Sequence, residues 1–334
     1  MRTATTGAGA RMGRDEEFAG LVEPFRRELL AHCYRMMGTL DEAEDLVQET
    51  FLRAWRGYAS FEGRSSLRVW LYKIATNACL NARERRSRRP LPSGLGPPSE
   101  EPDLPPKAAD GEIVWLQPIP DAMVTSGPGD PAAIVTARER LRLTLIASLQ
   151  HLTPRQRAVY ILREVLDFSA AEVAGMLGIT VVAGKSLLQR ARSGMEQVST
   201  VLDDAKEPTE PTARALLERY MAAFENSDLD ALERALRKDA ALEMVGSTTW
   251  FSGVETCLRY IGHVMEAPGT WRMLPTAANG QPAAAVYKRG EDGGYHALGV
   301  AVLAVASDGI TGIVLFSEPA LLPRFGMPPS LDAA

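Results

Sequence analysis

Three side chains of different chemistry, Trp70, Lys73 and Asn77, recur at intervals of three and four residues. On a helix this spacing places them along one flank. An aromatic face can stack an unpaired base, a lysine can neutralise a phosphate, and an amide can hydrogen-bond a base edge. The flank therefore suits single-stranded nucleic acid, although Trp70 taken alone fits a half-buried core position better.

Basic and aromatic residues surround this flank. The preceding loop at 61–66 contains Phe61, Arg64 and Ser65, and the arginines that follow the flank are Arg83, Arg85, Arg86, Arg88 and Arg89. Because each neutralised phosphate releases counterions, binding through these arginines should weaken as salt rises. The chain has a formal net charge of -5. Screening at physiological salt acts within about 8 Å, so a local positive patch remains effective.

An amphipathic helix is predicted to begin at Leu40. Thr39 and Glu42 have the spacing of a capping box. The residues predicted to face a core are Ala43, Leu46, Val47, Thr50 and Ala54, and the outer face is acidic, with Glu42, Glu44, Asp45, Gln48 and Glu49. Taken alone, such a face is more often solvated than a docking surface for a basic partner.

Two further capping boxes define a second helical unit. Thr153 pairs with Gln156 and Ser169 with Glu172, and Gly178 is placed to end the second helix. A third helix follows, so the pattern predicts a helix-turn-helix whose last helix enters the DNA major groove. Its predicted outward residues are Val182, Lys185, Ser186, Gln189 and Arg192, joined by Arg190, and its predicted inward residues are Ala183, Gly184, Leu187, Leu188 and Ala191.

Composition divides the chain into folded units and linkers. Residues 91–132 are rich in proline, glycine and acidic residues, which predicts a flexible linker. A second acidic, proline-bearing break lies at 203–212. The expected folded units are therefore 15–90, 133–202 and 211–328, after a disordered tail of about a dozen residues.

The bulk composition favours a globular protein of a reducing compartment. Hydrophobic residues make up 46% of the chain and charged residues 24%. The three cysteines are far apart, so neither a zinc cluster nor a disulfide framework is indicated, and no cofactor or metal is expected. No apolar run has the length of a membrane span, and no signal peptide is recognisable, so we expect a cytoplasmic protein without membrane contact.

Together these motifs resemble the sigma-70 family of RNA polymerase sigma factors, in its extracytoplasmic-function group. "DEAEDLVQETFLRAW" with "FEGRSSLRVWLYKIATNACLN" resembles region 2 of that family. "LTPRQRAVYILREVLDFSAAEVAGMLGIT" with "SLLQRARSGM" resembles region 4. The paired motifs cover under half of the chain. The resemblance implies two all-α domains, a region 2 helical bundle and a region 4 helix-turn-helix.

The resemblance also implies a partner for each surface. Glu44, Asp45, Gln48 and Glu49 would bind the clamp of the largest polymerase subunit, region 4 would bind the flap, and the linker would thread through the enzyme. The residues implied for the melted -10 element are Phe61, Arg64, Ser65, Trp70, Lys73, Asn77, Arg83, Arg85 and Arg86. Those implied for the duplex -35 element are Val182, Lys185, Ser186, Gln189, Arg190 and Arg192.

Two residues of the last helix depart from the family pattern. Gly184 stands where members usually carry a β-branched residue and Lys185 where they carry an asparagine. Gly184 should remove a core contact and cost about 1 kcal/mol of helix propensity relative to alanine. Lys185 should favour phosphate or guanine over adenine.

The third unit combines helices with a following run of strands, which predicts an α+β domain with an antiparallel sheet. It resembles the cone-shaped SnoaL-like fold, related to nuclear transport factor 2, and "EIVWLQPIPDAMV" resembles a linker segment of members that carry such a domain. The titratable candidates for catalysis are His263, His296, Asp308 and Glu318. Fold similarity does not transfer chemistry, so a regulatory or ligand-sensing pocket is favoured.

The leading prediction is therefore a non-enzymatic promoter-specificity subunit that binds core polymerase, recognises both promoter elements and promotes melting. An anti-sigma factor and a pocket ligand are further partners that the resemblance allows. The alternatives are a stand-alone helix-turn-helix regulator, and a small-molecule enzyme of isomerase or hydrolase type fused to a DNA-binding module. A simple regulator has no use for a strand-capturing helix, which counts against the first alternative.

Overall fold

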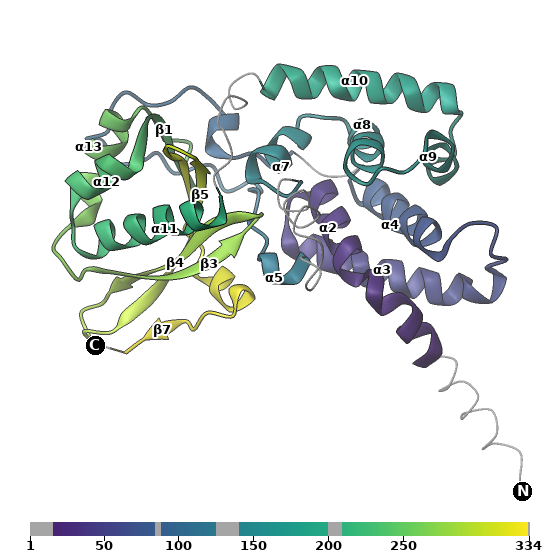
Figure 1. The fold of residues 1–334 in the computed structure, drawn as a ribbon, viewed down its shortest axis with the longest axis horizontal. Helices are drawn as coiled ribbons and strands as arrows, with labels where there is room; N and C mark the ends of the chain where they lie inside the picture. Colours follow the sequence, from purple (N-terminus) through teal and green to yellow (C-terminus); the bar gives the residue numbers. More distant parts are fainter. Residues whose placement is uncertain (1–15, 84–87, 125–139, 200–208, 333–334) are drawn as a thin grey trace, which may run out of the picture. The chain divides into compact units, whose positions relative to one another are not determined.

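The computed structural model describes residues 16–83, 88–124, 140–199 and 209–332 (Figure 1). They form two compact units. The first contains the described residues up to 83 and 151–197, and the second contains 88–124, 140–150 and the residues from 209 onward. The predicted N-terminal tail and most of the predicted break at 203–212 lie outside the described residues.

The first unit is entirely helical over the residues described. Its elements are η1 (Glu23–Phe25), α2 (Arg26–Met37), α3 (Leu40–Gly57), η2 (Tyr58–Ser60), α4 (Leu67–Arg83), α8 (Pro154–Tyr160), the π-helical turn η4 (Ile161–Val165), α9 (Ala170–Leu177) and α10 (Val181–Ser199). The side chains of α10 are described as far as 196.

Helix α3 begins at Leu40 as predicted, but its cap differs. Gly38 ends α2 in the left-handed region with φ 83°, and Thr39 is extended. The Thr39 side chain accepts no hydrogen bond from the helix backbone. Instead its hydroxyl donates to the Glu42 carboxylate at 2.9 Å. The predicted core face is confirmed: Ala43, Leu46, Val47, Thr50 and Ala54 are buried.

The two other capping boxes are confirmed. Thr153 caps α8 with Gln156, and Ser169 caps α9 with Glu172, with both reciprocal bonds present in each box. Gly178 ends α9 in the left-handed region with φ 64°. The local rules of helix capping therefore locate this helix-turn-helix correctly.

Helix α4 is the centre of the first unit, since it contacts α2, α3, α8 and α9. The Tyr72 ring packs against the Phe168 ring at 5.0 Å. The Arg68 guanidinium lies over both rings, at 5.0 and 4.7 Å, and pairs with Glu28 at 3.0 Å. Segments that the sequence predicts as separate units thus share one packed core.

The second unit contains a seven-stranded sheet in the order β2-β1-β6-β5-β4-β3, with β7 paired to β5. The strands are β1 (Leu236–Val245), β2 (Trp250–Ser252), β3 (Trp271–Ala278), β4 (Gln281–Arg289), β5 (Tyr295–Ala306), β6 (Gly309–Phe316) and β7 (Ser330–Leu331). Only the β1–β6 pair is parallel within the described sheet. The predicted α+β class is confirmed.

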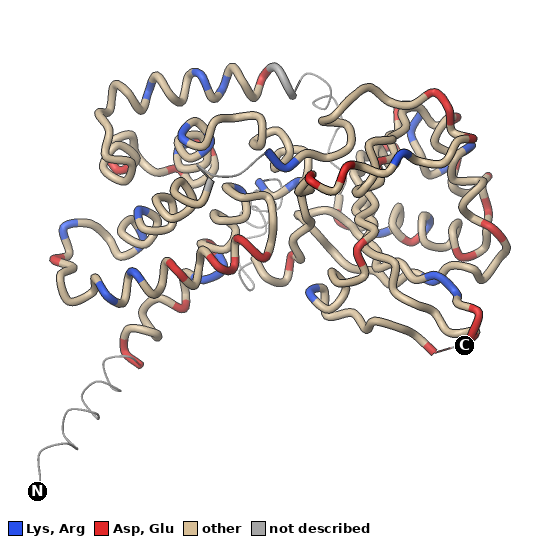
Figure 2. The backbone as a smooth tube through the Cα atoms, turned by 180° about the vertical axis from the view of Figure 1, so that it is seen from behind, with Lys and Arg blue, Asp and Glu red and all other residues tan. Residues whose placement is uncertain are grey.

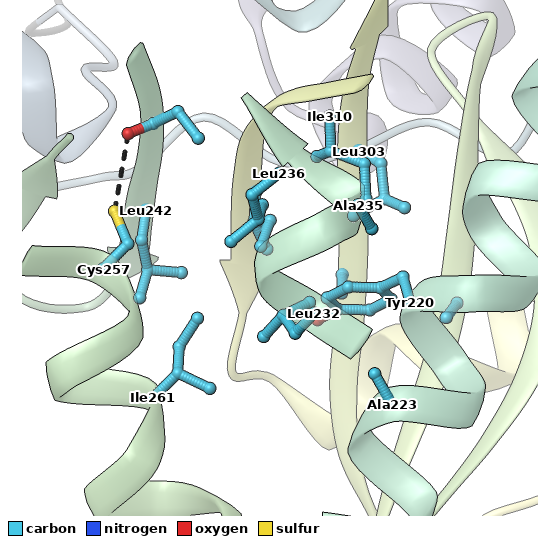
Figure 3. Close-up of a cluster of buried hydrophobic side chains, with 14 of the residues drawn as sticks. Tyr220, Ala223, Leu232, Ala235, Leu236, Leu242, Cys257, Ile261, Leu303 and Ile310 are labelled. Carbon is cyan, nitrogen blue, oxygen red and sulfur yellow. Dashed lines mark hydrogen bonds between the residues drawn. The ribbon is translucent and has the colours of Figure 1, made fainter. Parts of the chain in front are cut away.

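Three helices of this unit, α11 (Glu210–Glu225), α12 (Leu229–Ala235) and α13 (Val254–Met265), pack with the sheet. Buried side chains from all three and from the strands form one hydrophobic cluster (Figure 3). Tyr220 on α11 is part of it, and burial raises the pKa of its phenol. The Cys257 thiol donates to the Ala240 carbonyl at 3.5 Å, and burial raises the pKa of this thiol to about 12.

The short elements of the second unit belong to the segments outside this core. They are η3 (Pro92–Gly94), α5 (Asp121–Val124), α7 (Leu143–Leu149) and η5 (Pro319–Phe325). Across the described ranges, no single helix has the length and hydropathy of a membrane span. One pair of helices reaches that length and hydropathy when the two are taken together, Ala170–Leu177 and Val181–Glu196, and the pair is bent by 99°.

The segment predicted as a flexible linker lies on this unit over its described part, residues 91–124. The Ser99 amide donates to the Trp250 carbonyl at 2.8 Å, and the Trp250 indole donates to the Gly96 carbonyl at 2.9 Å. Asp103 accepts from Arg259 on α13 at 2.9 Å. The segment thus lies beside β2 and α13, where several of its polar groups find partners although it has no core of its own.

The β3–β4 turn connects this segment to the start of α7. The Asn279 side chain accepts from the Ile119 amide at 3.0 Å and donates to the Leu141 carbonyl at 2.8 Å. The Gln281 side chain accepts from the Leu143 amide at 2.9 Å. Asn279 is buried and has φ 57°, a conformation that asparagine tolerates better than most residues.

The two glycines of α10 provide a matched test of its packing. A Cβ at Gly184 would meet only Ile179 Cδ1, at 3.8 Å, whereas a Cβ at Gly194 would lie 2.9 Å from Leu152 Cδ2. Gly184→Ala should raise the free energy of unfolding by about 1 kcal/mol through helix propensity. Gly194→Ala should gain less, because Leu152 must move. Urea unfolding measures both, and equal gains would contradict this packing.

The buried imidazole of His32 predicts acid sensitivity of the first unit. Burial, reinforced by Arg35 and Arg68, lowers its pKa from 6.5 to about 3. The unfolded chain therefore binds the proton more readily, so the stabilisation is complete above pH 6.5 and is lost as pH falls toward 3. The slope contributed is about 1.4 kcal/mol per pH unit.

His32→Leu should flatten this part of the pH dependence. The measurement is hydrogen exchange of α2 and α4 amides between pH 6 and about 4, compared with wild type. His151→Leu, at an exposed histidine of the same unit, is the control and should retain the slope. An unchanged slope in His32→Leu would show that other groups carry the acid sensitivity.

Candidate nucleic-acid and polymerase interfaces

The aromatic part of the predicted strand-capturing flank is formed by a ring pair. The Trp70 ring on α4 lies 4.7 Å from the ring of Phe61, which belongs to the loop before the helix. Both side chains are half-buried. Gly57 leaves space for the indole, since a Cβ there would lie 3.3 Å from Trp70 Cζ2. The two rings therefore offer one partly exposed aromatic surface for stacking.

The polar part of the flank has two different environments. Lys73 is exposed. The Asn77 amide donates to the Lys73 carbonyl at 2.7 Å and to the Met176 carbonyl at 3.1 Å. Met176 belongs to α9 in the helix-turn-helix. Both amide protons of Asn77 are thus engaged within the protein, and the NH2 group can donate to a base only when one of these bonds breaks.

The loop at 61–66 exposes its predicted contact residues. Arg64 and Ser65 are exposed, and Arg64 pairs with Glu62 at 2.9 Å. Gly63 has φ 68°, which permits the tight turn. Ser66, which sequence reasoning did not select, accepts from the Val69 amide at 3.2 Å and so caps α4. Its position directly before a segment with helical spacing of apolar residues was the sequence signal that could have identified it as the cap.

The basic end of the flank is only partly described. Arg85 and Arg86 lie outside the described residues, and nothing is described of the Arg83 side chain. Arg88 is exposed and donates to the Gly94 carbonyl at 3.2 Å. Arg89 is only 2% exposed. The Arg89 side chain is therefore not available for a phosphate contact in this structure, contrary to the expectation of a solvated basic tail.

The predicted polymerase face lies on α3. Asp45 and Gln48 are exposed, while Glu44 and Glu49 are half-buried. Glu49 pairs with Arg53 one turn later at 2.6 Å. Figure 2 shows acidic positions in the first half of α3 and basic positions near its end.

Two large apolar residues extend this face and were missed from the sequence. Leu52 is 52% exposed and Trp55 is 49% exposed. Leu52 follows Asp45 and Gln48 by seven and four residues, so the three share one side of the helix. A projection of the whole helix would have revealed them. An acidic face with exposed apolar residues is suited to a protein partner.

All six predicted contact residues of α10 lie on the surface: Val182, Lys185, Ser186, Gln189, Arg190 and Arg192. Arg192 donates to Glu164 at 2.8 Å, and Arg190 donates to the Ser186 carbonyl at 3.3 Å. Leu188 and Ala191 are buried as predicted. Ala183, predicted to face inward, is exposed.

The four catalytic candidates of the second unit lie in different elements. His263 on α13 pairs with Asp103, and His296 on β5 pairs with Asp292, each at 3.0 Å. Asp308 follows β5 and pairs with Arg237 at 3.4 Å. Glu318 is an exposed residue after β6. The contacts of His263, His296 and Asp308 are separate polar pairs at the surface rather than an arrangement around a common reacting atom.

Comparison with known proteins finds three matching regions along the chain. Residues 21–89 match the family model for Sigma-70 region 2, residues 142–194 that for Sigma-70, region 4, and residues 217–313 that for the SnoaL-like domain. The crystal structure of the extracytoplasmic function sigma factor SigJ of Mycobacterium tuberculosis has the same fold. The TM-score is 0.60 at 22% identity, over 93% of this chain and 99% of that one.

Two curated sigma factors show the sequence relationship. SigW of Bacillus subtilis is 28% identical over 185 residues, which are 55% of this chain and 90% of SigW. The ECF RNA polymerase sigma factor SigG of Mycobacterium tuberculosis (strain H37Rv) is 49% identical over 327 residues, which are 95% of this chain and 86% of SigG. With its two sigma regions in order, the chain belongs to the extracytoplasmic-function RNA polymerase sigma factors.

Proposed function

We propose that this protein directs core RNA polymerase to promoters as a sigma factor of the extracytoplasmic-function group, and so acts in the cytoplasm. The single observation that carries this function is the presence, on one helical unit, of an acidic and apolar face on α3 together with the aromatic and basic flank of α4. The face of α3 is suited to binding a protein, and the flank of α4 is suited to binding a melted DNA strand. A stand-alone repressor needs neither.

The two DNA-directed surfaces have separate tasks. Phe61, Trp70 and Lys73 bind the unpaired strand of the -10 element, and the exposed side of α10 reads the -35 duplex. Asn77 joins the first set after α9 has left α4, because its amide is otherwise engaged with Met176. Assembly with polymerase therefore separates the helix-turn-helix from region 2.

The C-terminal domain has a regulatory and non-enzymatic role. Its β3–β4 turn binds the backbone at two places between the two sigma regions, at Ile119 and at Leu141. A domain that holds these segments restrains their movement into polymerase. The separate surface hydrogen bonds of His263 and His296 support this role over catalysis.

Reversing charge on α3 should impair core binding. Asp45→Lys with Glu49→Lys should weaken the affinity for core polymerase by at least about tenfold, since like charges then meet across the interface. Co-purification and fluorescence anisotropy measure this affinity. Glu16→Lys with Glu17→Lys, at two exposed residues of the same unit that lie before α2, is the control. Unchanged affinity of the first variant would remove this assignment.

Truncating the strand-capturing flank should impair melting. The triple variant Trp70→Ala, Lys73→Ala, Asn77→Ala should reduce open complexes by about tenfold or more while duplex binding changes less, because stacking is worth about 1–3 kcal/mol per base. Permanganate reactivity of promoter thymines measures melting. Undiminished reactivity in a folded triple variant would contradict strand capture.

Loosening the β3–β4 turn should raise transcription. Asn279→Gly keeps the left-handed turn, since glycine adopts φ 57° readily, but deletes both side-chain bonds. Hydrogen exchange at Ile119 and along α7 should accelerate. Transcript yield should also rise, by up to about tenfold for each 1.4 kcal/mol by which the variant lowers the free energy of holding these segments.

Asn226→Ala deletes an asparagine bond on the surface of the same domain. It is the matched control and should change neither the hydrogen exchange at Ile119 and α7 nor the transcript yield. Faster exchange in Asn279→Gly without a rise in transcription would show that the contact does not restrain the sigma regions.

A further inference from the structure

One apolar side chain stands out on the exposed side of α10. Val182 is 77% exposed, the highest fraction among the large hydrophobic side chains that the structure describes. Its neighbours on the same side, three, four and seven residues later, are Lys185, Ser186 and Gln189, and all are exposed. A valine among polar residues adds nothing to the core at this position.

The backbone holds Val182 rigidly at the start of the helix. It is the second residue of α10, and the Thr180 hydroxyl accepts from the Ala183 amide at 3.2 Å across the first turn. A β-branched side chain in a helix has one strongly preferred rotamer. The methyl groups of Val182 therefore project from the first turn in a defined direction and with little conformational entropy to lose on binding.

We propose that Val182 recognises the C5-methyl group of a thymine in the -35 element, an inference that rests on the proposed function of α10. The N-terminal residues of such a helix contact base edges. The thymine methyl is the apolar group that base edges present in the major groove. Lys185 and Arg190 on the same helix supply the charge that attracts the phosphates.

The size of the effect follows from burial of one methyl group. Removing that group from water is worth about 0.8 kcal/mol, which is about a fourfold change in affinity. Deoxyuridine lacks the C5-methyl of thymidine but keeps the same hydrogen-bonding edge. Replacing one thymine by deoxyuridine therefore isolates the contact.

The experiment uses the full chain with bacterial core RNA polymerase. The holoenzyme first selects duplexes from a library randomised across the -35 element. Affinity is then measured for a selected duplex in which each thymine in turn is replaced by deoxyuridine, with wild-type protein, Val182→Ala and Val181→Ala. Alanine favours the helix, so both variants fold. Val181 lies about 100° around the helix and is the matched control.

The expected result is one position at which deoxyuridine weakens wild-type and Val181→Ala binding by about fourfold but leaves Val182→Ala unaffected. Identical deoxyuridine losses in wild type and Val182→Ala would overturn the inference while leaving the proposed function intact. A selected -35 element without thymine would also overturn the inference, and so would a loss of core polymerase binding in Val182→Ala. Failure to select any -35 element would overturn the proposed function, and this inference with it.

Discussion

The helical unit depends on one buried cation. Arg157 on α8 is 1% exposed, and its guanidinium donates to the Met36 carbonyl at the end of α2 at 2.5 Å and to the Leu152 carbonyl at 3.3 Å. A buried charge costs several kcal/mol unless its hydrogen-bonding groups are satisfied. The arginine is therefore tolerated only while α8 lies at the end of α2, and this requirement joins the helix-turn-helix to the preceding helices.

Under the proposed function, this arrangement is the state that precedes binding to polymerase and promoter DNA. With Arg157 in place, α9 lies on α4, where the Met176 carbonyl engages Asn77 and Phe168 covers Tyr72. The Met176 carbonyl thus occupies an amide group that the proposed function assigns to a DNA strand. Under that proposal, separation of the helix-turn-helix requires that polymerase and DNA bind the separated state more tightly than this one.

The C-terminal domain holds other segments of the second unit through hydrogen bonds to their backbone. Asn279 in the β3–β4 turn and Gln281 at the start of β4 hold residues 119, 141 and 143, and the Ser99 amide donates to the Trp250 carbonyl of β2. The proline-rich segment is therefore held by hydrogen bonds to the domain, although it has no core of its own.

Much of the architecture was predictable from the sequence alone. Capping boxes, helical periodicity and the glycine stop located α3, α8, α9 and α10, and the run of strands indicated the α+β domain, because these signals act within a few residues of one another. The exposed side of α10 followed from the same periodicity, apart from Ala183. The two sigma motifs and their order along the chain indicated the sigma factor family.

Only the tertiary structure decided which distant segments meet. Nothing in the local pattern near Asn77 indicates a carbonyl 99 residues later, and Arg89 reads as a solvated arginine although it is buried. The described part of the predicted linker is held by strands that follow it by more than a hundred residues. Such contacts depend on shape and on unpaired backbone groups across the whole fold, which no short stretch of sequence encodes.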